Sequence, residues 1–237
     1  MKLSYLLFAV LTGTASLTVR GQAAADTSVQ GQKAMSPEAR AKSDAEVDKK
    51  AAAWVQSLQL NDTAKESRVT AVIATHLKAI RDWNNDHPYT TVPAGIDPST
   101  GKPLSTMDRQ VIAISAMPKS IHQDLMTGLR KDLTEDQVGA ILDKYTIGKV
   151  AFTMNGYKAI VPDLTPQEEA AILANLQQAR EQAVDFKNAK QISAIFEIYK
   201  TKSEQYLNAN GRNWRALFKA YVDEQKAKKA AAGKTAQ

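Results

Sequence analysis

Apolar side chains recur every three or four residues along most of the chain, which is the spacing of one face of an α-helix. The clearest stripe lies within residues 62–84 and comprises Val69, Val72, Ile73, His76, Leu77, Ile80 and Trp83. Similar patterns predict further helices from about residue 46, over 106–131 with a break at Pro118, and over 134–145, 165–187, 189–207 and 212–229. The pattern therefore predicts an all-α fold, an irregular helical bundle of roughly six to eight helices.

Two of the predicted helices begin with the same capping signal. Thr134 is followed three residues later by Gln137, and Thr165 is followed three residues later by Glu168. In such a capping box, the two side chains bind backbone N–H groups that the first helical turn leaves unpaired. Pro166 takes the first helical position after the second cap, where proline is favoured. Helix starts are therefore expected at both threonines.

Two segments depart from the helical pattern. Prolines at 88, 93, 98 and 103 remove backbone donors and disfavour helix, so residues 88–104 are predicted to form a long Pro-rich loop. The segment 148–162 begins with a glycine and contains Asn155-Gly156, a pair that permits positive φ. We expect this segment to be a short insert of extended chain and turn between two helices.

The N-terminus has the features of a secretory signal peptide. Lys2 precedes an apolar run, Leu6–Leu11, and the small residues Ala23 and Ala25 match a cleavage site. A membrane anchor is the alternative, but the run is far shorter than the roughly 20 residues that cross a bilayer. Residues 1–25 are therefore predicted to be removed. This implies a periplasmic or extracellular (secreted) protein with no membrane attachment after cleavage.

Composition divides the rest of the chain. Residues 26–45 are polar and alanine-rich, which predicts a flexible lead-in; residues 46–225 are expected to form a single helical domain. Residues 226–237 are rich in lysine and predict a basic disordered or frayed tail. The basic residues of the signal peptide and tail account for the whole net charge of +6. A near-neutral domain does not favour nucleic acid as a partner. The absence of cysteine excludes disulfides and a cysteine nucleophile.

The end of the 62–84 helix carries a candidate ligand-binding group. Trp83, Asn84, Asp86 and His87 lie close together in the sequence. An aromatic ring can cover the apolar face of a sugar, while amides and carboxylates bind its hydroxyl groups. The same residue types also end helices and form turns. A purely structural role is therefore the alternative.

The histidines show no metal-ligand spacing, so no metal site is predicted. His122 is flanked by polar residues at the margin of a helix face and is a further candidate to bind a ligand. His76 lies within an apolar stripe, where a buried, hydrogen-bonded histidine is expected. No phosphate-binding or dinucleotide-binding motif occurs, so no cofactor is predicted.

Three charged residues share the 165–187 helix. Glu181 and Asp185 are four residues apart, an unfavourable like-charge pair unless a cation lies between them. Such a cation could be a lysine of another helix, or a ligand. Arg180 lies beside this pair and is a further candidate to bind a ligand, with surface salt bridges as the alternative.

A run of short motifs resembles one family of bacterial proteins. The motifs are Thr146-x-Gly148, Gly156-Tyr157, Pro162–Thr165 and Ala179–Ala183, with His87 and His122 at similar positions. Over about residues 60–211, the chain is similar to a domain-of-unknown-function family of secreted helical proteins that are often encoded near polysaccharide-utilisation genes. The resemblance implies an extracytoplasmic protein linked to glycan metabolism. It adds Asn155 and Tyr157 to the candidate ligand-binding residues.

A shorter resemblance involves Leu133–Gln137, which matches the L-T-x-x-Q signature of all-helical periplasmic stress chaperones. Three functional hypotheses follow. The first is a secreted accessory or carbohydrate-binding protein of polysaccharide utilisation, with an oligo- or polysaccharide as its partner. The second is a small glycan-active enzyme, a hydrolase or lyase, whose catalytic pair would be defined by separation in space and not by sequence spacing. The third is a chaperone-like protein.

Overall fold

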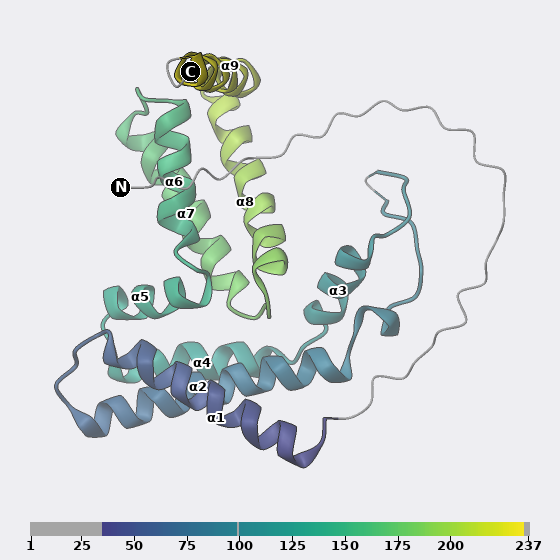
Figure 1. Ribbon diagram of the computed structural model, residues 1–237, viewed down its shortest axis with the longest axis vertical. Helices are drawn as coiled ribbons and strands as arrows, with labels where there is room; N and C mark the ends of the chain where they lie inside the picture. Colours follow the sequence, from purple (N-terminus) through teal and green to yellow (C-terminus); the bar gives the residue numbers. More distant parts are fainter. Residues whose placement is uncertain (1–34, 99, 235–237) are drawn as a thin grey trace. The chain divides into compact units, whose positions relative to one another are not determined.

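The computed structural model describes residues 35–98 and 100–234, so the predicted signal peptide lies outside the described residues. These residues form nine α-helices and one turn of 3₁₀-helix, which confirms the all-α fold (Figure 1). The elements are α1 (Pro37–Gln56), α2 (Thr63–Asp86), η1 (Tyr89–Thr91), α3 (Thr106–Ser115), α4 (Lys119–Asp132), α5 (Glu135–Tyr145), α6 (Lys149–Ile160), α7 (Pro166–Ala183), α8 (Ala189–Ala209) and α9 (Trp214–Lys234). Both predicted capping boxes are present, at Thr134 and at Thr165.

Four helices surround the first of two hydrophobic cores. Helices α1, α2 and α4 lie side by side, and α5 packs against α1 and α4 (Figure 1). The buried side chains of Val55, Val69, Ile73, Leu129 and Ile141 form the centre of this core. These residues come from the apolar stripes of the four helices, so the core follows from the helical periodicity of the sequence.

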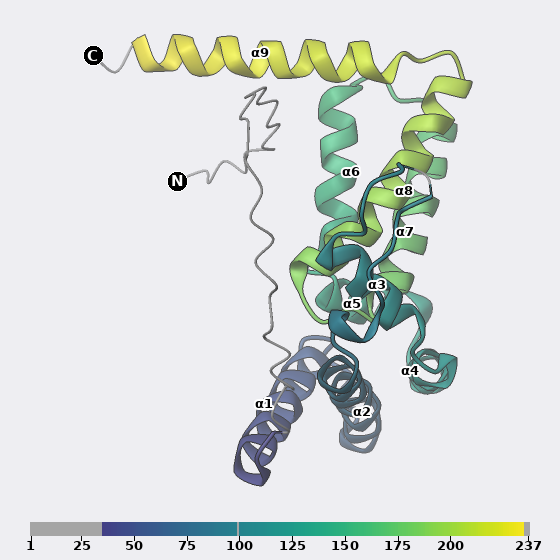
Figure 2. The same ribbon diagram turned by 90° about the vertical axis from the view of Figure 1, so that its right-hand side faces the viewer.

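The second core lies among the helices of the C-terminal half. Helices α6, α7 and α8 pack alongside one another, and α9 crosses the end of α6 and α8 (Figure 2). Ile172 and Leu176 of α7 and Phe196 of α8 are fully buried in this core. Helix α3 adds Ile114 to the same cluster.

The C-terminal end of α7 joins the two cores. Ile172 and Leu176 within α7 belong to the second core, whereas Val184, directly after α7, belongs to the first. Helix α7 also contacts α5. Side chains near residue 184 can therefore meet residues of both helical groups, and the candidate site lies at this junction.

The outer helices extend further than predicted. Helix α1 begins at Pro37, where the Ser36 hydroxyl accepts the Ala39 N–H at 3.2 Å, so residues 37–45 of the predicted flexible lead-in are helical. Helix α9 continues to Lys234, so most of the lysine-rich segment predicted as a disordered or frayed tail is also helical. None of the helices in the described part of the chain is long and apolar enough to cross a membrane.

The expected insert of extended chain and turn at residues 148–162 is wrong, because Lys149–Ile160 form helix α6. The Asn155-Gly156 pair, which predicted a turn, lies inside this helix. The reason is tertiary burial: α6 packs on α7 and α9, and Tyr157 is only 2% exposed. Burial of an apolar face outweighs weak local helix propensity.

The predicted Pro-rich loop at 88–104 is irregular chain that is held against α3. It contains η1 and one isolated antiparallel bridge between Ile96 and Pro103. Arg109 of α3 donates to the Val92 carbonyl from Nε at 2.8 Å and from Nη2 at 2.5 Å. These contacts tie the middle of the loop to the helix that follows it.

Candidate functional site

A partly buried carboxylate, 19% exposed, is shared by two histidines at the junction of the two cores. Asp185, just after α7, accepts a hydrogen bond at Oδ1 from His76 Nε2 at 3.0 Å and at Oδ2 from His122 Nδ1 at 3.0 Å. His76 comes from α2 and His122 from α4. One carboxylate therefore joins three helices that are far apart in the sequence.

The inner histidine is in contact with a buried phenol. His76 is 3% exposed, and its Nδ1 lies 3.2 Å from the Tyr145 hydroxyl, which in turn lies 3.4 Å from the Ile73 carbonyl oxygen. A neutral His76 accepts a hydrogen bond from the Tyr145 hydroxyl at Nδ1, whereas an imidazolium donates one to the Tyr145 oxygen, and the hydroxyl then donates to the Ile73 carbonyl. In both arrangements His76 Nε2 carries the proton that Asp185 accepts.

The surroundings shift the acid–base properties of three groups. The pKa of His122 is raised, chiefly by its hydrogen bond to Asp185 and then by the charges of Asp185 and Glu181, which outweigh partial burial. Burial alone would raise the pKa of Asp185, but the hydrogen bonds and charges of the two histidines lower it. Burial raises the pKa of Tyr145 well above its usual value. The site thus favours an ionised Asp185 beside a protonated His122.

The outer histidine, His122, lines a groove of about 520 Å³. His122 Nε2 is 3.9 Å from Glu181 Oε1. Other side chains that line the groove are Lys119, Gln123, Gln178, Gln182, Phe186 and Tyr199. Because Asp185 holds Nδ1, the Nε2 atom is the one that can exchange a proton with a bound molecule.

The group predicted at the end of α2 is engaged in structural contacts. Trp83 donates from Nε1 to the Ala113 carbonyl at 3.0 Å and stacks on His87 with ring centroids 3.7 Å apart. Asn84 is buried and donates to the Ile80 carbonyl at 2.9 Å. Asp86 is exposed. These contacts fasten the end of α2 to α3, and none of them brings His87 and His122 together.

The remaining predicted residues have different surroundings. Asn155 is exposed on α6, whereas Tyr157 packs in the second core and donates from its hydroxyl to the Lys200 carbonyl at 3.1 Å. Tyr157 thus has a structural role. Arg180 lies between α5 and α7, where it contacts the Gly139 carbonyl. Two of the predicted ligand-binding residues line a pocket in the described part of the chain. His122 lines the groove of about 520 Å³, and Arg180 lines a pocket between α5 and α7.

Two members of the site were not among the predicted ligand-binding residues. His76 lies on α2 and Asp185 just after α7, and nothing in the sequence places them beside His122. The one available signal was the like-charge spacing of Glu181 and Asp185. The cation that this spacing required is the imidazole of His122, which lies within 4 Å of both carboxylates.

The two imidazoles face opposite oxygens of one carboxylate and do not converge on a point. Among residues 35–98 and 100–234, no group of three or more histidine, aspartate or glutamate side chains has the arrangement of a metal site.

The fold and the site define an all-α protein in which an Asp-linked histidine pair connects the core to a polar groove. The chain belongs to the family described as "Protein of unknown function (DUF3826)", whose family model matches residues 44–227. None of the curated proteins compared with the chain matches it.

Proposed function

We propose that this is a secreted carbohydrate-binding protein of polysaccharide utilisation, and that its ligand occupies the groove beside His122. The observation that carries the proposal is the composition of the groove wall. Gln123, Gln178 and Gln182 contribute amides that can both donate and accept hydrogen bonds, as sugar hydroxyl groups require. Tyr199, which is only partly buried, contributes ring surface for the apolar face of a sugar, and Phe186, 9% exposed, adds a small apolar area.

The size and charge of the groove support a sugar ligand. Its volume of about 520 Å³ lies within the range of small-molecule sites. The positive charges of Lys119 and protonated His122 balance the negative charges of Glu181 and Asp185 in the groove. A groove with balanced charge and with both amide and apolar lining suits a polyhydroxylated ligand with apolar ring faces better than a highly charged one. Export, the other part of this proposal, rests on the N-terminal sequence.

Calorimetry with a panel of plant oligosaccharides tests the proposal. We expect saturable binding by at least one glycan, weakened about 5- to 10-fold by Gln182→Ala, which removes a hydrogen-bonding amide. Gln167→Ala is the matched control, because Gln167 is exposed at the other end of α7. Absence of binding across the panel by the folded protein would overturn the proposal, and so would binding that Gln182→Ala leaves unchanged.

A second candidate is a small glycan-active enzyme, and one observation favours it. His122 is held at Nδ1 by a partly buried carboxylate with Nε2 facing the groove, which is the arrangement of a general acid or base. Glu181, 3.9 Å from Nε2, would be the second acid–base group. If the protein is an enzyme, incubation with the bound glycan yields shorter products, and His122→Asn abolishes turnover while binding persists. Binding without any product would exclude this candidate.

A further inference from the structure

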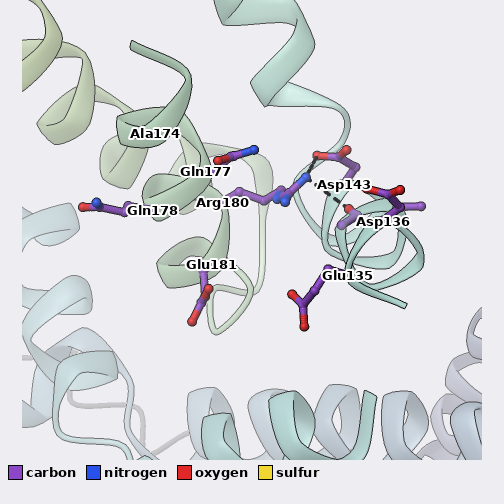
Figure 3. Close-up of a pocket in the computed structure, with 10 residues that line it drawn as sticks. Glu135, Asp136, Asp143, Ala174, Gln177, Gln178, Arg180 and Glu181 are labelled. Carbon is purple, nitrogen blue, oxygen red and sulfur yellow. Dashed lines mark hydrogen bonds and ion pairs between the residues drawn. The ribbon is translucent and has the colours of Figure 1, made fainter. Parts of the chain in front are cut away.

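A second pocket lies on the other side of the same stretch of α7. It is a space of about 620 Å³ between α5 and α7, and Figure 3 shows Arg180 reaching across it from α7 toward Asp143 of α5. Glu135, Asp136 and Gln177 lie around it. Its polar wall has no aromatic residue, so it differs from the groove beside His122.

The guanidinium in this pocket has unused hydrogen-bonding capacity. Arg180 Nη1 donates to the Gly139 carbonyl at 3.2 Å and lies 3.1 Å from Asp143 Oδ1. Within the described residues, the buried Arg180 Nε has no hydrogen-bond partner, and the buried Asp143 Oδ1 is held only by its ion pair with Arg180 Nη1. Such atoms are uncommon in folded proteins, because each loses its hydration without replacement. A ligand hydroxyl that displaces the guanidinium from Asp143 can hydrogen-bond to both side chains.

A glycine makes room for this arrangement. A Cβ atom at position 139 would lie 3.3 Å from Arg180 Nη2 and 3.4 Å from Nη1. A glycine inside a helix such as α5 costs about 1 kcal/mol relative to alanine. Gly139 therefore leaves room for the Arg180 guanidinium, although it makes helix α5 less stable than alanine would.

The two pockets share a wall. Gln178 and Glu181 line both of them. On the α4 side, Arg130 contacts Glu135 at 3.2 Å and Glu181 at 4.0 Å, so an exposed cation bridges the boundary. Helix α7 thus presents one polar strip that runs from the Arg180 pocket to the His122 groove.

We propose that the pocket around Arg180 is a second subsite of the same binding groove, so that the ligand is an oligosaccharide lying along α7 across both subsites. This inference rests on the proposed function. Side chains that pair carboxylates with a guanidinium can hydrogen-bond several hydroxyl groups at once. The pocket holds four carboxylates, Glu135, Asp136, Asp143 and Glu181, against one cation, so neutral sugar units are favoured over uronates there.

Calorimetry with oligomers of one to six units tests this inference. The probes are neutral cello-, xylo- and manno-oligosaccharides and acidic galacturonate oligosaccharides. We expect affinity for a neutral series to rise at least about 10-fold once the chain is long enough to fill both subsites. Arg180→Gln is expected to remove this gain while leaving the affinity of the shortest binding oligomer unchanged. Arg215→Gln, at an exposed site on α9, is the control.

A second variant keeps the inference testable if Arg180→Gln does not fold. Glu135→Gln combined with Asp136→Asn changes only exposed side chains and is expected to raise affinity for acidic oligomers several-fold. Failure of every glycan to bind overturns the proposed function and the inference together. Binding that does not strengthen with length, or a gain that survives Arg180→Gln in the folded variant, overturns the two-subsite inference alone.

Discussion

His122 donates its Nδ1–H to the carboxylate of Asp185 across 3.0 Å, and this contact links the groove to the buried part of the molecule. The carboxylate is mostly buried and accepts a second N–H from His76. Because a buried charge is tolerated only when it is paired and hydrogen-bonded, each histidine supports the ionised state of Asp185. The relationship has consequences for stability that can be measured without any ligand.

The protonation of His122 should make stability depend on pH. Its pKa is raised above the ordinary value of 6.5, so protonated His122 contributes stability that is fully present below pH 6.5 and is lost as pH rises through the folded-state pKa. We expect the gap in unfolding free energy between the natural protein and His122→Gln to narrow from about pH 5.5 to about pH 8.5. Urea denaturation across this range measures it. A gap that stays constant would show that His122 does not titrate against Asp185.

Removal of the shared charge should destabilise the fold. Asp185→Asn removes two charge-assisted hydrogen bonds and leaves His76 buried without its anionic partner. We expect a loss of about 2–4 kcal/mol in the free energy of unfolding, measured by urea denaturation. Asp86→Asn changes an exposed carboxylate on α2 and should stay within about 0.5 kcal/mol. Equal effects of the two substitutions would contradict a structural role for the cluster.

Ile147 is expected to destabilise the protein as it stands. This β-branched residue has a φ of 59°, in the left-handed region, and its side chain is 66% exposed. Ile147→Asn should raise the unfolding free energy by about 1 kcal/mol, since asparagine tolerates this conformation better. Thermal unfolding measures the change. Ile198→Asn, at a half-exposed site within α8, should bring no gain, and an equal response at both sites would refute the strain argument.

The start of α7 should be sensitive to acid. Hydrogen bonds from Arg212, and then from the backbone of Thr165, lower the pKa of Glu168 from 4.5 to about 2. Because this folded-state pKa is depressed, its stabilising contribution is present above pH 4.5 and is lost as pH falls toward about 2. Acid titration followed by circular dichroism should show this loss, and Arg212→Gln should weaken it.

The geometry around Glu168 also predicts a difference between arginine and lysine. Arg212 donates from Nε to one oxygen of Glu168 and from Nη2 to the other, each at 2.9 Å. Arg212→Lys keeps the charge but not this fork, so we expect it to lower the melting temperature by several degrees, nearly as much as Arg212→Gln. Full retention of the melting temperature by the lysine variant would show that charge alone matters.

Local signals in the sequence predicted most helices correctly because those helices follow local rules. Thr134 and Thr165 each start a helix through a capping box, as their spacing required. The break at Pro118 also occurs, between α3 and α4. The error at α6 arose because Asn155-Gly156 is a turn signal only when no tertiary contact opposes it. Burial of Tyr157 against its neighbours provides that contact.

The candidate site could be predicted only in part. His122 and Arg180 were identified from their residue types and neighbours, and both line pockets. Trp83 and His87 had equally suitable chemistry, but their side chains stack on one another at the end of α2. Residue type alone does not separate these cases, because an aromatic–histidine pair can hold a sugar or fasten a helix end with the same atoms.

The sequence by itself determined most of the helices, the two capping boxes and the apolar faces that form the two cores, since these depend on contacts within a few residues. Only the tertiary structure decided that His76, His122 and Asp185 meet, because α2, α4 and the end of α7 become neighbours through packing of the two cores. The like charges of Glu181 and Asp185 required a cation between them, and the fold supplied it from another helix.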